Sequence, residues 1–355
     1  MINISAKITG IKYTPLLCKK LHVFDFNELA RALSKEATFI LKVNDKNQIA
    51  VSWWVSAKRT RSYPYTRVYD SLKFSGKKVT IIPIVKDEGK EGDRDFLQWD
   101  TISLMSLLGV YVIISYYKNA SKSSKYKHKI TNQRFDIEQI KTEIKKLLSY
   151  QSDALHWNLE QIDKAGEIGK KALESYDEIS KRTGVEMHSR KSAEKRIKKL
   201  LEGKDTFMIL SRDLAEKAQK RETVTVQPKE KLRGIKATLT IKNYLGGYYY
   251  FTCDEIEINQ KRVYLIEGKH TKTANLPSLA DIKDGLLKMI LFTNLEDVRI
   301  DDKSYNPVPI LKLTTREKFR IELLNKAQKE MLTLLKKEAK VNGFKILINK
   351  NLLVE

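Results

Sequence analysis

Several features that would assign the chain to a particular class are scarce or missing. Its 355 residues include two cysteines, Cys18 and Cys253, too few for a disulfide framework or a multi-cysteine zinc site. The five histidines are scattered. The longest apolar run, residues 102–117, falls short of the roughly 20 residues that a membrane span needs. The opening MINISAKITG lacks the apolar core of a signal peptide. We therefore expect a cytoplasmic protein that does not cross a membrane.

Acidic residues are also in short supply. The chain has 44 Asp and Glu against 67 Lys and Arg, a formal net charge of +23. Positive charges in such excess repel one another in a compact protein, and this cost is offset when the usual partner is a polyanion. Nucleic acid is the first candidate and an anionic membrane surface the second. Apolar residues make up 41%, enough for a sizeable core, and the length allows about two domains of roughly 150 residues.

The order of patterns along the chain predicts a mixed α/β protein in three parts. Residues 1–134 contain β-branched, strand-like runs and one helix-like stretch, which predicts an N-terminal α/β domain. We expect this domain to recognise DNA. Residues 135–204 space their apolar side chains at three and four, as in amphipathic helices, and would form a helical connector. Residues 205–355 would form the last domain. There we expect two strands, a helix introduced by Ser278, a further strand, and a long helix capped by Thr315.

Three charged residues interrupt two apolar runs of this last part. The stretch YYYFTCDEIEINQKRVYLIEGKHTK, residues 248–272, has Asp254 in its first run and Glu267 and Lys269 at the end of its second. A turn at residues 259–261 would pair the runs antiparallel and bring Asp254 near Glu267, while residues two apart share a face. Burying charge on a strand is unfavourable without compensation. Two carboxylates and one ammonium at a sheet edge are suited to hold Mg²⁺ beside a phosphate.

This pattern resembles the PD-(D/E)xK nuclease superfamily. The matching residues are Asp254, then twelve residues, then Glu267-Gly268-Lys269, followed by a helix and a strand. The resemblance covers roughly residues 205–355. It implies a central mixed sheet flanked by helices. It also implies that Asp254 and Glu267 bind Mg²⁺, that Gly268 offers its carbonyl as a ligand, and that Lys269 is the catalytic lysine that positions the water. The proline that often precedes the aspartate in this family is absent.

Other interpretations of these residues stay open. Glu255 is a second candidate for the first metal ligand because it adjoins Asp254. A cross-strand salt bridge on a solvent-facing edge would explain the same charges without catalysis. A rival pattern, Glu88-Gly89-Lys90 with Asp70 upstream, lies in a polar run that is typical of a solvated loop. Residues 56–58, Ser-Ala-Lys, would end a second hairpin that resembles a degenerate nuclease core.

Basic residues gather in three stretches suited to DNA. Residues 53–67 interleave arginines with Trp53, Trp54 and tyrosines; the arginines can pair with phosphates or guanine edges, and the aromatic rings stack on bases or fill the core. Residues 118–134 hold six Lys and Arg and no acid, which predicts a flexible loop that contacts phosphates or is simply solvated. Residues 188–199 place basic side chains along one helix. The predicted DNA-binding residues are Lys58, Arg59, Arg61, Arg67, Lys122, Lys125, Lys127, Arg190 and Lys191.

These observations and the resemblance together predict a type II restriction endonuclease. Its substrate would be double-stranded DNA, its cofactor Mg²⁺, and its products 5′-phosphate and 3′-hydroxyl ends, as the resemblance implies. A homodimer paired through the helices of residues 136–180 would cut both strands, and a cognate DNA methyltransferase would be its genetic partner. Two other functions stay open. One is a nuclease with the same core that serves repair, recombination or transposition, and the other is a basic DNA-binding protein without catalysis.

Overall fold

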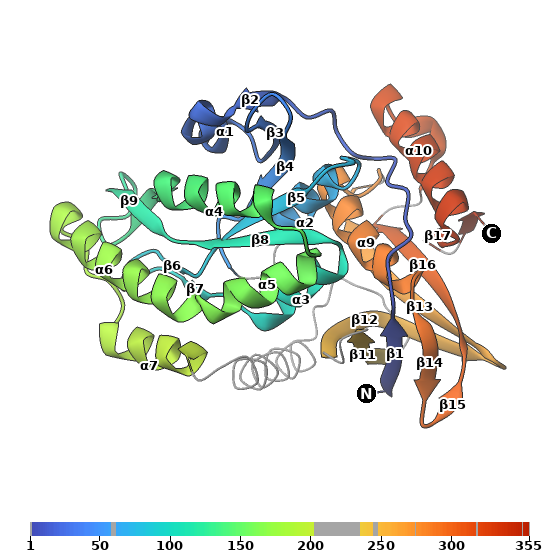
Figure 1. The fold of residues 1–355 in the computed structure, drawn as a ribbon. Coiled ribbons are helices and arrows are strands. Elements are labelled where there is room, and N and C mark those ends of the chain that lie inside the picture. Colours follow the sequence, from blue (N-terminus) through green and yellow to red (C-terminus); the bar gives the residue numbers. More distant parts are fainter. Residues whose placement is uncertain are drawn as a thin grey trace. The chain divides into compact units, whose positions relative to one another are not determined.

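In the computed structural model of the protein, the described residues are 2–57, 62–201, 235–243, 248–273, 275–316, 319–349 and 351–354. They confirm the mixed α/β class, with helices packed on sheets that contain parallel and antiparallel strands (Figure 1). Contacts divide the chain into two compact units. The first comprises Met1–Lys20, Tyr65–Lys73 and Ala215–Glu355, and the second comprises Leu21–Pro64 and Phe74–Leu214. The chain therefore enters each unit more than once, whereas the sequence predicted three consecutive parts.

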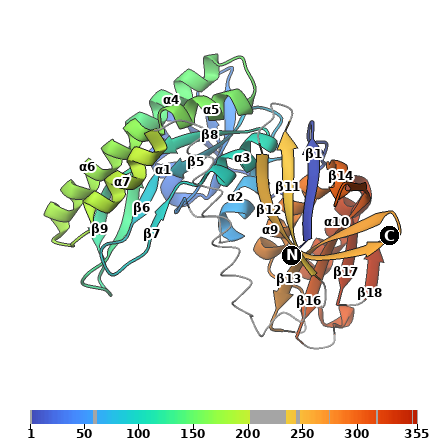
Figure 2. The same cartoon turned by 90° about the horizontal axis from the view of Figure 1, so that it is seen from below.

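The first unit is built on one long sheet, with the strand order β15-β14-β1-β11-β12-β13-β16-β17-β18. Strands β12 and β13 form the expected antiparallel hairpin, and β13 pairs in parallel with β16, as β16 does with β17. Figure 2 shows β1, β11 and β12 side by side. The bounds are β1 Ile2–Ile8, β11 Ile235–Asn243, β12 Tyr248–Asn259, β13 Arg262–Thr271, β14 Glu296–Ile300, β15 Lys303–Ser304, β16 Asn306–Thr315, β17 Lys345–Ile348 and β18 Asn351–Val354.

Strand β1 belongs to this sheet and not to the N-terminal domain that the sequence predicted. It pairs in parallel with β11 and antiparallel with β14. The alternation of apolar and polar residues along β1 explains why the strand lies in this sheet. Ile4, Ala6 and Ile8 point to one face and are buried. Such a strand needs neighbours on both edges to satisfy its backbone, and here they come from the C-terminal part of the chain.

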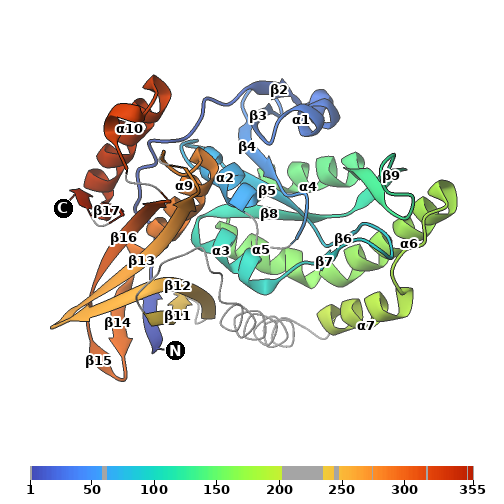
Figure 3. The same ribbon diagram turned by 180° about the vertical axis from the view of Figure 1, so that it is seen from behind.

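Helices α9 (Leu279–Phe292) and α10 (Lys326–Asn342) belong to the same unit, and α9 packs on β13 and β16 (Figures 1 and 3). Helix α9 begins as predicted, since the side chain of Ser278 accepts a hydrogen bond from the N–H of Asp281. Helix α10 begins later than predicted. Thr315 ends β16 instead of capping the helix, and Asn325 and Gln328 form the capping box. Helix α2 (Ser62–Ser71) is shared, with Tyr65–Lys73 in the first unit.

The second unit has a five-stranded sheet in the order β2-β3-β4-β5-β8 and two small two-stranded sheets, β6 with β7 and β9 with β10. Its strands are β2 Val23–Asp25, β3 Thr38–Lys42, β4 Gln48–Trp53, β5 Lys78–Pro83, β6 Val85–Asp87, β7 Arg94–Phe96, β8 Val110–Ser115, β9 Tyr117–Lys122 and β10 Ile130–Phe135. Its helices are α1 Leu29–Lys35, α3 Trp99–Leu107, α4 Ile137–Ser149, α5 Ala154–Asp163, α6 Ala165–Thr183 and α7 Arg190–Leu201.

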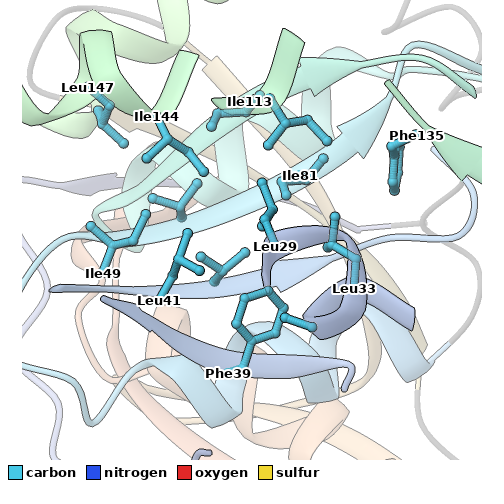
Figure 4. Packing of buried hydrophobic residues seen from close by; sticks show 14 of the residues in the cluster. Leu29, Leu33, Phe39, Leu41, Ile49, Ile81, Ile113, Phe135, Ile144 and Leu147 are labelled. Carbon is cyan, nitrogen blue, oxygen red and sulfur yellow. The ribbon is translucent and has the colours of Figure 1, made fainter. Parts of the chain in front are cut away.

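The core of the second unit lies between its sheet and helices α1 and α4. Leu29 of α1 and Ile144 of α4 meet Phe39, Leu41 and Ile81 of the strands (Figure 4). The helices predicted as a connector therefore pack on the N-terminal sheet, because their apolar stripes need a partner face. The apolar side chains of these helices, which suggested pairing in a dimer, are buried in the core of the unit. Among the described helices, none combines the length and the apolar character that a membrane crossing requires.

Candidate active site

The paired part of the β12–β13 hairpin ends next to Asp254. The ladder runs from Asn259–Arg262 to Glu255–Ile266. Just beyond its end, the N–H of Gly268 donates to Oδ2 of Asp254 at 2.9 Å. A carboxylate thus stands where the ladder would have placed a backbone carbonyl. This arrangement turns Asp254 toward the strand that carries Glu267.

Both oxygens of Glu267 are bound by lysines. Its side chain is 2% exposed, and Nζ of Lys269 lies 2.9 Å from Oε1. On the other side, Nζ of Lys288 donates to Oε2 at 2.6 Å and to the carbonyl of Thr252 at 3.2 Å. Glu267 and Lys269 lie two residues apart and share a face, as the sequence predicted. The buried charge is therefore compensated within the protein.

Helix α9 supplies two residues of the site that sequence reasoning missed. Lys269 forms a second ion pair with Asp284, and Lys288 follows four residues later on the same face of the helix. The site then comprises five charged side chains. When all are ionised, its three carboxylates and two ammonium groups leave one negative charge in excess. They are Asp254, Glu267, Asp284, Lys269 and Lys288. The signal in the sequence was an opposite-charge pair, Asp284 and Lys288, at a spacing of four on the helix after the hairpin.

Burial and neighbouring charges set the protonation of the two acids. Burial, together with the charge of Asp254, raises the pKa of Glu267 to about 7. Burial opposes ionisation of Asp254 too, but the charge of Lys288, the N–H of Gly268 and a hydrogen bond from the Glu267 carboxyl outweigh it, and the pKa of Asp254 is lowered. Below about pH 7, Glu267 therefore holds a proton while Asp254 is ionised, and above that pH both are ionised.

The two lysines remain protonated. Burial acts to lower the pKa of Lys269, but the charges of Glu267 and Asp284 outweigh it, and the pKa is raised well above its usual value. The pKa of Lys288 is raised in the same way by Glu267 and Asp254 against the effect of burial. Both side chains are therefore hydrogen-bond donors at neutral pH, and neither has a free lone pair with which to accept a proton from water.

Glu255 lies on the opposite face of the sheet. Successive residues of a strand point to opposite sides, and Glu255 accepts a hydrogen bond from Nζ of Lys312 at 2.5 Å. It is 2% exposed. Of the two adjacent acids, Asp254 is therefore the one that shares a face with Glu267.

Gly285 allows α9 to approach the strands that carry the site. A Cβ atom at this position would lie 2.7 Å from Cδ1 of Leu311 and 3.2 Å from Cε of Lys269. A contact of 2.7 Å does not occur without movement of a neighbour, and one of 3.2 Å is tight. The alkyl chain of Lys269 therefore occupies the space that the missing side chain leaves.

The donor set of this site is compatible with Mg²⁺. No group of three or more His, Cys, Asp or Glu side chains that would hold a metal occurs within the described ranges, so the oxygens must come from two carboxylates and the backbone. An extended residue directs its N–H and its C=O to the same side. Since the N–H of Gly268 points at Asp254, its carbonyl faces the same gap. Mg²⁺ commonly uses one or two carboxylates and completes its shell with water and phosphate oxygens.

The first predicted DNA-binding stretch is only partly described. Lys58, Arg59 and Arg61 lie outside the described residues, and Arg67 is half-buried on α2. Of the two alternatives for the tryptophans, stacking on bases or filling the core, the structure supports the second. Trp54 is fully buried, and Nε1 of Trp53 donates to the carbonyl of Glu36 at 2.8 Å. Both rings pack as core residues and are not platforms for bases.

The other two stretches adopt definite structures. The predicted flexible loop of residues 118–134 is the β9–β10 hairpin. Lys122, Lys125 and Lys127 are exposed on it. Arg190 and Lys191 are exposed at the start of α7, but Arg190 forms ion pairs with acidic side chains, Asp177 and Glu194. Arg190 is thus already engaged by carboxylates, whereas the lysines of the hairpin offer positive charge to a partner.

The rival pattern at residues 88–90 does not assemble a second site. Lys90 is 63% exposed and pairs with Glu186, and Glu88 pairs with Lys86. Asp70 belongs to the other unit, where it pairs with Lys283 at 2.6 Å. The predicted second hairpin exists as β3 and β4, but the serine that follows it, Ser56, donates to Oδ2 of Asp95.

Comparisons of the chain with protein-family models, curated proteins and solved structures found no match. The function must therefore be argued from the residues of the site.

Proposed function

We propose that the protein is a Mg²⁺-dependent endonuclease that cleaves duplex DNA at specific sites, as a type II restriction enzyme does. The observation that carries the proposal is the meeting of Asp254, Glu267 and Lys269 on one face at the end of the β12–β13 ladder. Helix α9 and the parallel strand β16 follow the hairpin, in the order that the resemblance to PD-(D/E)xK nucleases implies. The net charge of +23 favours a polyanionic substrate.

The residues have distinct tasks in the proposed reaction. Asp254, Glu267 and the carbonyl of Gly268 would hold Mg²⁺, which supplies positive charge to a phosphodiester oxygen when it is bound. Lys269, fixed between Glu267 and Asp284, donates hydrogen bonds that orient the attacking water and offset the charge developing on the phosphate. The water oxygen bonds to phosphorus while the P–O3′ bond breaks. The attacking water loses a proton to a neighbouring solvent molecule, and the departing 3′ oxygen takes up a proton from solvent and leaves as a hydroxyl.

Assembly and genetic context are further parts of the proposal. Cutting both strands of a symmetric site is most simply done by two related active sites, and twofold dimers are the commonest oligomers. We therefore propose a homodimer on DNA. A restriction enzyme also requires a cognate DNA methyltransferase to protect the host.

A second candidate function is a basic DNA-binding protein without catalysis. The pairing of both Glu267 oxygens with Lys269 and Lys288 favours it, because the carboxylate is satisfied without a metal. A repair, recombination or transposition nuclease would use the same residues as a restriction enzyme but a different DNA structure. The three functions therefore differ in whether the protein cleaves DNA, in the DNA structure that it cleaves, and in whether it binds a metal.

Incubation with phage DNA and Mg²⁺, followed by electrophoresis, separates these functions. Discrete fragments from intact duplex support a restriction enzyme, whereas cleavage confined to branched or damaged DNA supports a repair or recombination nuclease. Asp254→Ala, Glu267→Ala and Lys269→Ala should each abolish cleavage, and the Lys269 variant should still bind DNA. Glu257→Ala is the matched control, since Glu257 is an exposed acid on the same strand. Full cleavage by the Asp254 and Glu267 variants would rule out the metal site.

A further inference from the structure

The β9–β10 hairpin is a two-stranded ribbon with an unusual exposed face. In its register Asn119 is opposite Arg134, and Ser121 is opposite Thr131. Asn119 and Ser121 lie two apart, and Ser121 and Thr131 are cross-strand partners, so these three side chains project from the same side. The register shifts on both sides of Arg134, which lies across from Asn119 at this irregularity. All four are exposed. Together they present one amide, two hydroxyls and one guanidinium.

Those four side chains have unused hydrogen-bonding capacity. Across the part of the chain that the structure describes, no hydrogen bond or ion pair engages them. The segment from 118 to 134 contains no acidic residue that would pair with its cations. An exposed polar face of this kind is hydrated in the free protein and can exchange its water for a polar ligand.

The ribbon is anchored along its length. The N–H of Ile130 donates to the carbonyl of Glu88 at 3.0 Å, and Nε2 of Gln133 donates to the carbonyl of Asp87 at 2.7 Å. On the other strand, Oγ of Ser175 donates to the carbonyl of Tyr117 at 2.7 Å, and β9 lies beside α6 (Figures 1 and 3). A face held in this way loses little conformational entropy on binding.

The tip of the ribbon carries the exposed lysines. The N–H of Ser123 donates to the carbonyl of Lys129 at 2.9 Å, and its Oγ accepts a hydrogen bond from the N–H of Tyr126 at 3.2 Å. Lys125 and Lys127 are exposed on either side of Tyr126, which is itself 62% exposed. An ordered turn thus places positive charges next to the polar face.

We propose that the β9–β10 ribbon enters the major groove of duplex DNA and that its polar face contacts base edges. The major groove admits a two-stranded ribbon, and base pairs there present distinct sets of donors and acceptors. Arginine pairs with guanine through two hydrogen bonds, asparagine pairs with adenine in the same way, and hydroxyls pair with either. Arg134 and Asn119 supply the first two contacts, and Ser121 and Thr131 the others. The lysines at the tip neutralise phosphates. This inference rests on the proposed function for its substrate, duplex DNA.

Selection from a pool of duplexes with a randomised core tests the proposal, with Ca²⁺ in place of Mg²⁺ so that binding and not cleavage is read. We expect the wild-type protein to enrich one sequence. Asn119→Ala and Arg134→Lys should each lose discrimination at one or two base pairs by roughly 5- to 150-fold, the range for one bidentate contact. Arg134→Lys keeps the charge and loses the planar donor pair. Changing both Lys125 and Lys127 to Ala should weaken binding to every duplex alike and lower the salt slope by up to about 0.9 per lost phosphate contact.

A matched control is Arg182→Lys, an exposed arginine near the end of α6, which should enrich the wild-type sequence unchanged. Enrichment of that same sequence with full discrimination by both ribbon variants would overturn the proposal. A wild-type protein that enriches no sequence, or that prefers single-stranded nucleic acid to duplex, would overturn it as well. Because the assay reads binding, a protein without nuclease activity can still pass it, and the two proposals fail separately.

Discussion

The Lys288→Met substitution distinguishes a metal site from a salt bridge. It removes an ammonium group that lies 2.6 Å from Oε2 of Glu267, whose side chain is 2% exposed. Breaking a buried ion pair by removing one partner costs about 3–5 kcal/mol because the other charge stays buried. Lys288 retains 21% exposure, and Lys269 still contacts Glu267. We therefore expect a loss of about 2–3 kcal/mol in the free energy of unfolding without metal.

Mg²⁺ should recover much of this loss. At about 100 times its dissociation constant, a ligand that binds only the folded state adds about 2.7 kcal/mol. The variant should also gain more from Mg²⁺ than the wild type does, because Lys288 no longer competes for Glu267. The four tryptophans, at positions 53, 54, 99 and 157, all belong to the second unit. Tryptophan fluorescence therefore reports urea unfolding of the second unit, and the part of the far-UV circular dichroism transition that fluorescence does not follow reports the first; both are recorded at pH 8, with and without Mg²⁺.

Lys312→Met is the matched control on the other face of the sheet. Lys312 pairs with Glu255 at 2.5 Å, with side-chain exposures of 17% and 3%, so its removal should destabilise the protein to a similar degree. Mg²⁺ should stabilise this variant only as much as the wild type. Equal responses of the Lys288 and Lys312 variants to Mg²⁺, or no response of any of the three proteins, would refute the metal site.

Three further predictions concern the same face of the sheet. Gly285→Ala should reduce cleavage and leave DNA binding intact, because its added methyl group overlaps Leu311 and displaces Lys269; overpacking of this kind costs about 1–3 kcal/mol, and unchanged cleavage would refute the argument. Asp254→Asn should lose the Mg²⁺-induced rise in melting temperature, whereas Glu255→Gln should keep it while lowering the melting temperature itself. The pKa of Glu267 is raised to about 7, so a proton that is held below that pH must leave before a metal can bind. Mg²⁺ should therefore raise the melting temperature more at pH 8 than at pH 6, and the reverse order would contradict the assignment.

Local pattern was sufficient for the elements that carry the site. The hairpin of β12 and β13, the start of α9 at Ser278 and the common face of Glu267 and Lys269 all depend on alternation, turn residues and capping, which act over a few positions. The same local signals failed at Thr315, where a residue suited to capping continues a strand. Pairing of β16 with β13 along its whole length outweighed the local preference, since propensity yields to tertiary contacts.

The sequence by itself determined the mixed α/β class, the excess of positive charge and the spacing of Asp254, Glu267 and Lys269, because these depend on composition and on residues near one another. Only the tertiary structure decided that β1 joins the C-terminal strands, that Asp284 and Lys288 bind the site lysine and the site glutamate, and that Glu255 faces away toward Lys312. It also decided that a basic stretch read as a loop is a ribbon with a polar face. Such outcomes depend on which distant segments pack together to bury apolar surface and pair backbone groups, and no local pattern encodes that choice.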